Sequence, residues 1–291
     1  MFKNLNFKKY GLLFIALLLL SADIFLFQLD WQNSHRKFTF AMLDVGQGDA
    51  LFIESPSGTQ VLIDSGPSKK ILGRLQQMMP FYDKTIDAII LSHADQDHLG
   101  GFLDVLKNYK VVKIFESGTI SDSKTYKNLE EEIKNQNIPD IPAKKGMRLN
   151  LGGGAIMDIL FPDRDVSNWD TNDGSMVARL SYGNAKIMLT GDATKKTEGI
   201  ILSENVKESL QSSILKVSHH GSHTGTSKEF LDAVSPAYAL ISVGKDNKYG
   251  HPHQDTLDAL NLFGAKIFRT DKLGTIIIKS DGTKEIFSFL K

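Results

Sequence analysis

Four potential metal ligands lie within six residues of one another, directly after an apolar stretch of the chain. They are His93, Asp95, Asp97 and His98 in the segment SHADQDHLGG at residues 92–101. Side chains alternate along an extended strand end, so His93 and Asp95 are expected to point the same way, whereas the turn that follows aims the other two elsewhere. Imidazole and carboxylate groups are suitable ligands for zinc, manganese or iron. One short loop could therefore supply two adjacent metal positions.

Three further segments carry similar chemistry, each just beyond an expected strand. Asp192 stands in a Thr-Gly-Asp turn, where its carboxylate could bridge two cations. His219 and His220 are followed by Gly-Ser, and His251 and His253 form a Gly-His-Pro-His turn. Six of the eight histidines thus fall in three loops, and histidines scattered through a core would not concentrate in this way.

The elements that must position these groups read as one α/β domain at residues 38–291. Hairpin-like strands come first and then alternate with helices, a pattern that predicts a mixed sheet system covered by helices. Strands are expected at 38–44, 50–54, 60–64, 88–92, 155–161, 176–182, 186–190, 213–217, 239–243, 265–269 and 275–279, and helices at 71–79, 102–106, 126–136 and 254–262.

Composition indicates a folded protein and excludes several other classes. The chain of 291 residues is 41% hydrophobic, which is enough to bury a full core and excludes a disordered or fibrous protein. The 34 basic residues balance the 34 acidic ones, so the net charge offers no global attraction to nucleic acid. No cysteine is present, which excludes a disulfide framework, a thiolate metal site and a cysteine nucleophile.

Residues 1–29 read as a membrane anchor or signal segment. Lys3, Lys8 and Lys9 precede an apolar run at 11–29, which is just long enough to span a bilayer. Basic residues stay on the cytoplasmic side of a span, so the rest of the chain is expected outside the cell. The sequence therefore predicts a single-pass protein of the cell membrane with an extracellular catalytic domain.

Two alternatives to an uncleaved anchor stay open. Cleavage after Ala22 would secrete the domain, although Leu20 is a poor residue for the small position that a signal peptidase requires. The apolar run could also be a buried helix of the globular domain. In each case residues 30–37, DWQNSHRK, read as a short polar linker.

The order of these motifs resembles that of the metallo-β-lactamase fold superfamily, and more narrowly the hydrolase domain of ComEC-type DNA-internalisation proteins of bacterial competence. The resemblance covers nearly the whole domain. It rests on LDVGQGDA at 43–50, LIDSG at 62–66, HADQDHLGG at 93–101, LTGDA at 189–193, LKVSHHGS at 215–222, YGHPH at 249–253 and RTDKLGTI at 269–276. It implies a four-layer αβ/βα sandwich with metals at one edge, between the two sheets.

The resemblance also implies the residues of the site, with two divalent ions, Zn²⁺ or Mn²⁺. The ligands would be His93 and Asp95 for one ion, Asp97, His98 and His219 for the other, and Asp192 as the bridge. Asp64 would orient the ligand loop from behind. The groups expected to contact the ligands or the substrate are Asp64, Ser175, His220, Ser222 and His253.

One departure from the family pattern bears on the metal. Many superfamily members have His at the position of Asp95 and a third His before the bridging aspartate, where this chain has Asn-Asp-Gly-Ser ending at Ser175. The first metal position is thus richer in oxygen, which makes manganese a candidate beside zinc. Asp95 could be a ligand or could hold a water. His220 could replace His219 as the ligand, because adjacent residues at a strand end face opposite ways.

These ligands predict hydrolysis of a phosphodiester. Two neighbouring cations can share a hydroxide and neutralise phosphate oxygens. Asp97 could orient the attacking water as well as ligate, and His251 or His253 could contact the phosphate or protonate the leaving group. The expected catalytic residues are Asp97 and His251.

The leading interpretation is a two-metal phosphodiesterase or nuclease that acts on DNA outside the membrane. The lysine pairs of the chain, at 69–70, 144–145 and 195–196, are isolated from one another, so the sequence shows no basic groove for DNA. An alternative substrate is therefore a cell-surface polymer, as for a teichoic-acid phosphorylcholine esterase. β-Lactam hydrolysis fits the motifs less well. A non-catalytic surface protein that retains a metal is the alternative from a different class.

Overall fold

The computed structural model describes residues 3–34 and 36–291, and the chain divides into two units, Met1–Arg36 and Lys37–Lys291. The first unit is the helix α1 (Lys3–Ser34). Its window Tyr10–Phe27 has a mean hydropathy of 2.3 with none of its residues buried, so it is a candidate membrane span.

Part of the segment expected as a linker, residues 30–37, is helical in the structure. Helix α1 continues through residues 30–34, and residue 35 of that linker lies outside the described residues. No glycine or proline stands in residues 30–34 to end the helix, which explains why the polar composition did not interrupt it.

The second unit contains two large sheets. The eight-stranded sheet has the order β17-β16-β1-β2-β3-β5-β7-β8. Its strands are β1 (Phe38–Met42), β2 (Leu51–Glu54), β3 (Gln60–Ile63), β5 (Ala88–Leu91), β7 (Ile114–Glu116), β8 (Asp140–Pro142), β16 (Thr275–Ser280) and β17 (Glu285–Leu290). A separate two-stranded sheet pairs β4 (Thr85–Ile86) with β6 (Lys110–Val111).

The seven-stranded sheet has the order β15-β14-β13-β12-β11-β10-β9. Its strands are β9 (Arg148–Gly152), β10 (Ala155–Phe161), β11 (Val177–Tyr182), β12 (Ala185–Leu189), β13 (Ile214–Lys216), β14 (Tyr238–Ile241) and β15 (Lys266–Arg269). Strands β12 to β15 run parallel, as do β3, β5, β7 and β8 in the first sheet.

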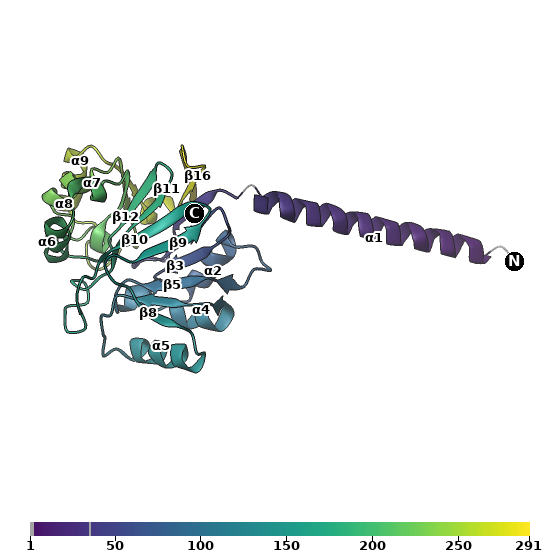
Figure 1. The fold of residues 1–291 in the computed structure, drawn as a ribbon, viewed down its shortest axis with the longest axis horizontal. Helices are drawn as coiled ribbons and strands as arrows, with labels where there is room; N and C mark the ends of the chain where they lie inside the picture. The colour runs from purple at the N-terminus through teal and green to yellow at the C-terminus, as the bar shows by residue number, and fades with distance from the viewer. Residues whose placement is uncertain (1–2, 35) are drawn as a thin grey trace. The chain divides into compact units, whose positions relative to one another are not determined.

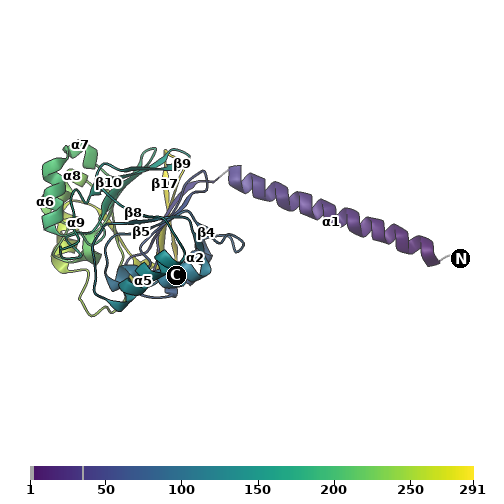
Figure 2. The same cartoon turned by 60° about the horizontal axis from the view of Figure 1, so that its bottom comes forward.

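Helices cover the outer face of each sheet (Figures 1 and 2). On the eight-stranded sheet they are α2 (Lys70–Met78), α3 (Gln96–Leu99), α4 (Phe102–Asn108) and α5 (Lys124–Asn135). On the seven-stranded sheet they are α6 (Lys195–Glu204), α7 (Lys207–Leu210), α8 (Lys228–Val234) and α9 (Gln254–Leu262). The short elements η1 (Ser218–Gly221) and α10 (Thr270–Leu273) complete the unit.

Alternation along the strands explains this layering. In β1, Phe38, Phe40 and Met42 belong to the core between the two sheets, whereas Ala41 belongs to the core under α2 and α4. Successive side chains of a strand point to opposite faces, and both faces of these strands are covered by apolar neighbours. The mixed sheets covered by helices, expected from the pattern, are confirmed, as is the α/β sandwich that the family resemblance implies.

The motif loops meet at one edge of the sandwich. They follow the carboxyl ends of β5, β12, β13 and β14, which are parallel strands of the two facing sheets. In open α/β sheets, ligands bind at that end of the strands. The fold therefore brings together side chains that lie more than 100 residues apart in the chain.

Candidate metal centre

The loop after β5 is held in place by its backbone. The hydroxyl of Thr119 accepts a hydrogen bond from the backbone N–H of Ala94 at 2.9 Å, and Ser65 donates its backbone N–H to the carbonyl of His98 at 2.6 Å. The helix α3 begins after Asp95 and places His98 on its buried side. The ligand loop is thereby fixed from both of its neighbouring segments.

Asp64 orients this loop from behind the site. Its carboxylate accepts the backbone N–H of Ser92 at 2.9 Å and the hydroxyl of Ser92 at 2.6 Å. It also lies 2.8 Å from Nδ1 of His98. A carboxylate can only accept, so the Nδ1–H of His98 donates to it, and Nε2 is left to face Asp192. The contacts suit the orienting role expected for Asp64.

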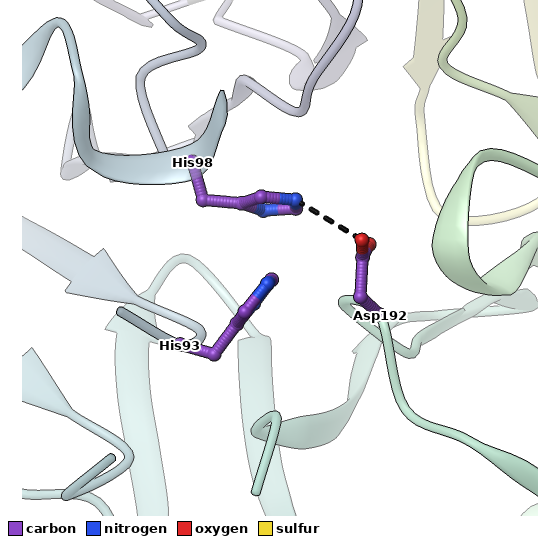
Figure 3. A group of neighbouring side chains, drawn as sticks. All are labelled: His93, His98 and Asp192. Atoms are coloured by element: carbon purple, nitrogen blue, oxygen red, sulfur yellow. Dashed lines mark ion pairs between the residues drawn. The ribbon is translucent and has the colours of Figure 1, made fainter. Parts of the chain in front are cut away.

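Side chains from three loops converge in front of Asp64. Nε2 of His98 lies 3.3 Å from Oδ2 of Asp192, and Nε2 of His220 lies 3.4 Å from the same oxygen. Nε2 of His220 is also 3.3 Å from Oδ2 of Asp97. Among the compact sets of possible ligands that contain His98, one adds His93 and Asp192, another adds Asp97 and His220, and a third adds Asp49 and Asp64. Figure 3 shows the first set, with both imidazoles directed toward Asp192.

The adjacent residues His219 and His220 lie differently. His220 is buried, and its Nδ1 lies 2.9 Å from the carbonyl of Ser242, so that Nδ1–H donates and Nε2 faces the site. His219 contacts the hydroxyl of Thr224 through Nδ1 at 2.9 Å, and its Nε2 is 3.7 Å from Asp192. The geometry favours His220 over the family-implied His219 as the third ligand beside Asp97 and His98.

The backbone explains how both histidines come to face the same region. His219 and His220 have φ angles of 47° and 54°, in the left-handed region. A non-glycine residue is uncommon there, and such strain concentrates at functional sites. This turn ends the extended course of the strand, so the expectation that adjacent residues face opposite ways does not apply.

Asp95 lies at the margin of the centre. Oδ2 of Asp95 is 3.6 Å from Nε2 of His93, while Oδ1 accepts the hydroxyl of Thr171 at 2.7 Å. Its side chain is 37% exposed, so it has access to solvent that the buried ligands lack. The structure is compatible with either role proposed for it, as a ligand or as an acceptor for a water.

Two buried charges behind the site were missed in the sequence. Lys216 is fully buried and forms an ion pair with Asp49. Its Nζ donates to the carbonyl of Gly191 at 2.6 Å and lies 3.6 Å from Oδ1 of Asp192. A signal was available, because a lysine within the apolar strand LKV and an aspartate after Gly-Gln-Gly both break an otherwise apolar pattern.

The donor atoms fit a divalent cation. The Nε2 atoms of His93, His98 and His220 are buried, and within the described residues none of them makes a hydrogen bond. Unpartnered buried nitrogens are costly, so three in one place indicate a common ligand. Ligands 2.0–2.1 Å from a tetrahedral ion are about 3.3–3.4 Å apart, which matches the separations around His220. Imidazole and carboxylate donors suit Zn²⁺ or Mn²⁺.

The electrostatics of the centre favour positive charge among these side chains. Burial alone would lower the pKa of His220, but Asp192 and Asp49 raise that pKa to about 10. Burial likewise opposes protonation of His98, yet Asp192 and Asp64 raise its pKa well above the ordinary value. Excess carboxylate thus makes both imidazoles hold a proton when no cation is present. A metal ion would displace those protons.

The last histidine loop lies next to the centre. The ring centroid of His251 is 5.5 Å from that of His219 and 6.3 Å from that of His220. Burial and the two neighbouring imidazoles lower the pKa of His251 to about 4, so it is neutral near pH 7. His253 is 4.8 Å from His251 between ring centroids, and its Nδ1 accepts the backbone N–H of His223.

The two serines expected at the site brace its loops. The hydroxyl of Ser175 accepts the backbone N–H of Asp192 at 3.2 Å, which helps to hold Asp192 in place. The hydroxyl of Ser222 accepts from the hydroxyl of Thr224 at 3.0 Å, and Thr224 in turn contacts His219. Both serines are buried. These contacts indicate that the two serines stabilise the loops that carry the candidate ligands.

Comparisons with known proteins agree with this geometry. The family model described as the metallo-beta-lactamase superfamily matches residues 43–245. ComE operon protein 3 of Bacillus subtilis is 34% identical over 255 residues, which cover 81% of this chain and 32% of that protein. Competence protein ComA of Neisseria gonorrhoeae is 29% identical over 80% of this chain and 31% of its own length. The resemblance to competence proteins of the metallo-beta-lactamase superfamily is confirmed, and this chain spans about a third of the length of those relatives.

Solved structures share the fold at low sequence identity. The metallo-beta-lactamase fold protein YhfI of Bacillus subtilis superposes with a TM-score of 0.52 at 14% identity, covering 79% of this chain and 96% of that one. Igni18, a metallo hydrolase of Ignicoccus hospitalis, superposes with a TM-score of 0.51 at 15% identity, covering 87% of this chain and 100% of that one. These likenesses confirm the sandwich expected from the motifs.

Proposed function

This chain belongs to the metallo-beta-lactamase superfamily, and we propose that it is a metal-dependent phosphodiesterase or nuclease acting outside the cell membrane. The observation that carries the proposal is the set of three unpartnered imidazole nitrogens, which face carboxylate oxygens 3.3–3.6 Å away. This arrangement supports the binding of a divalent cation within the fold of a hydrolase family.

Two cations held by these residues would supply Lewis-acid chemistry and lower the pKa of an attacking water. One position would use Asp97, His98 and His220, and the other would use His93 with Asp95 beside it. Asp192 faces both sets and would connect them. Asp64, through its bond to Nδ1 of His98, keeps that ring turned toward the ligand position.

The residues at the open side of the centre would handle the substrate. The side chain of Asp97 is 32% exposed, and His98 and His220 lower its pKa against the effect of burial, so it is a carboxylate that can accept a hydrogen bond from water. The lowered pKa of His251, about 4, leaves a neutral ring near pH 7. We therefore assign His251 to phosphate contact rather than to protonation of the leaving group.

The substrate class rests on the relatives. Competence protein ComA and Recombination protein 2 of Haemophilus influenzae carry names that refer to competence and to recombination, and the latter is 29% identical over 90% of this chain. We infer that a DNA phosphodiester is the first substrate to test. A phosphodiester of a cell-surface polymer requires the same metal chemistry and is the alternative that the assay separates.

The location follows from α1. Its apolar window is long enough to cross a bilayer, and the lysines before it favour a cytoplasmic N-terminus. We propose that residues 1–29 anchor the chain and that residues 38–291 form the hydrolase domain on the outer side. Protease treatment of intact cells should degrade the domain, and a protected domain would contradict the orientation.

The test of activity uses purified protein prepared without chelator. Metal content is measured first, followed by hydrolysis of bis-p-nitrophenyl phosphate, p-nitrophenyl phosphorylcholine and linear DNA with added Mn²⁺ or Zn²⁺. An Asp97→Ala/His98→Ala variant is the control. Metal-dependent cleavage that disappears in this variant is the expected result. Bound metal without turnover of any phosphodiester would overturn the proposal, and absence of bound metal would overturn the ligand assignment.

A further inference from the structure

An exposed aromatic loop stands at the edge of the domain opposite the metal centre. Phe81 is 85% exposed and Tyr82 is 52% exposed, and their rings contact each other edge-to-face at 5.4 Å between centroids. Figure 2 shows the loop projecting beyond β4. Val112, 43% exposed, lies after β6, which pairs with β4. Large apolar side chains grouped on a surface in this way usually mark an interaction site.

Basic side chains surround these apolar residues. Lys84, Lys110 and Lys113 are all exposed. Lys84 and Lys110 are neighbours, because the backbone N–H of Lys110 donates to the carbonyl of Lys84 at 2.7 Å, and Lys113 directly follows Val112. Two of the ammonium groups also lie over aromatic rings, that of Lys84 over Tyr109 at 5.1 Å and that of Lys113 over Phe115 at 5.9 Å. We call the six residues Phe81, Tyr82, Lys84, Lys110, Val112 and Lys113 the basic aromatic patch.

The acidic residues near the patch are already engaged. Asp83 accepts the side-chain amide of Gln60 at 2.9 Å and the backbone N–H of Thr85 at 3.1 Å. Asp87 accepts the backbone N–H of Gln60 at 2.8 Å. These neutral donors leave both carboxylates charged, but the three lysines outnumber the two aspartates, so the patch keeps a net positive charge.

The patch lies at the edge where the chain enters the domain. Thr39 of β1 pairs with Glu54 of β2, and Glu54 pairs with Gln60 of β3, so these residues form a row across three strands. Neighbouring strands are about 4.8 Å apart, which puts Gln60 about 10 Å from Thr39. Because Gln60 binds Asp83, the aromatic loop is next to that row.

The chain between α1 and the domain is short. From the end of the apolar window at residue 27 to Phe38, seven helical residues and a few extended ones reach at most about 20–25 Å. If α1 crosses a bilayer, as proposed above, this edge of the domain is held near its surface. Aromatic rings and lysines are the side chains that favour the interface of a bilayer.

We infer that the basic aromatic patch docks the domain on the surface of an anionic phospholipid bilayer. Phe81 and Tyr82 would enter the interface, and the three lysines would contact lipid phosphates. Strands β3 and β5 run from this edge to Asp64 and to the loop of His93, so docking would direct the metal centre away from the bilayer. The inference rests on the proposed membrane anchor and not on the hydrolytic activity.

The experiment uses the full chain, which contains no cysteine, so a single label can be introduced. Phe81→Cys and, as control, Ile120→Cys are labelled with the environment-sensitive dye NBD and reconstituted into vesicles with or without phosphatidylglycerol. Ile120 is 58% exposed and follows β7 at the edge of the metal centre. Quenching of the dye by brominated lipid is measured after flotation of the vesicles.

The expected result is a blue shift and quenching at position 81 but not at position 120. A Lys84→Glu/Lys110→Glu/Lys113→Glu variant should lose most of the quenching at 81 that phosphatidylglycerol adds. If the chain floats with the vesicles but the dye at position 81 stays in water, docking of the patch on the bilayer is refuted while the membrane anchor stands. The aromatic loop would then be a binding site for a protein partner. A chain that does not float would overturn the anchor and, with it, this inference. Neither outcome bears on hydrolysis.

Discussion

Replacing Lys216 with methionine should destabilise the domain strongly although no metal ligand is removed. The ammonium group of Lys216 is fully buried and pairs with the buried carboxylate of Asp49. It also donates to the carbonyl of Gly191 and lies 3.6 Å from Asp192. Methionine fills a similar volume, so the main effect is the loss of a charge and its hydrogen bonds.

The size of the expected destabilisation follows from leaving the buried carboxylate of Asp49 without its ion-pair partner. Removing one member of a buried ion pair costs about 3–5 kcal/mol. For a domain of about 250 residues, 1 kcal/mol changes Tm by about 2–4 °C, so Lys216→Met should lower Tm by roughly 6–20 °C. A bound divalent cation would supply positive charge near Asp192, so the loss should be larger in the presence of a chelator.

The assay is thermal unfolding of a double-mutant cycle with and without EDTA. Asp49→Asn and Lys216→Met are measured alone and together. Removing both partners of a buried ion pair often changes the free energy of unfolding little. The double variant should therefore be more stable than the sum of the two single losses of stability predicts. Strict additivity of the two losses would refute the pairing. A Tm of Lys216→Met within 2 °C of the parent chain would refute the argument as a whole.

Three further predictions concern the ligands and an acidic cluster. His220→Ala should lose bound metal and at least about 100-fold in phosphodiesterase activity, with a smaller loss in His219→Ala, as metal analysis and initial rates will show. Metal should bind at least about tenfold more tightly at pH 8 than at pH 6 in competition titrations, because the raised pKa values of His98 and His220 make protons compete. Burial and the neighbouring Glu130 raise the pKa of Glu116 from 4.5 to about 8, so the folded state holds its proton and stability is lost as the pH rises through that range. Tm should therefore fall between pH 5 and pH 9, and Glu116→Gln should abolish that component of the fall; an unchanged slope would contradict the assignment.

The motif residues could be identified from the sequence because the candidate ligands lie close together in short segments of the chain. The spacing of His93, Asp95, Asp97 and His98 after an apolar run predicts a loop of metal ligands. The apolar window of α1 was evident from composition, since a span needs only length and hydropathy. The boundary at residues 30–37 was less evident, because helix ends depend on whether a stop signal is present.

The choice between His219 and His220 required the structure. Both follow the same strand, and a left-handed turn brings both Nε2 atoms toward Asp192. His220 is buried and lies 3.3 Å from Asp97, whereas the side chain of His219 is 23% exposed and its Nδ1 contacts Thr224. Backbone angles of this kind are set by the packing of the surrounding loops and not by local sequence preference.

The sequence by itself determined the family, the two-sheet architecture and the histidine and aspartate loops, because periodicity and short motifs are local properties of the chain. Only the tertiary structure decided that Asp49 and Lys216 sit behind the ligands and that Phe81 and Lys110 share a surface. These relations join segments far apart in the chain through strand pairing, and each segment taken alone has an ordinary composition. Burial of a charge, and the partner that compensates for it, exist only once the sheets have packed.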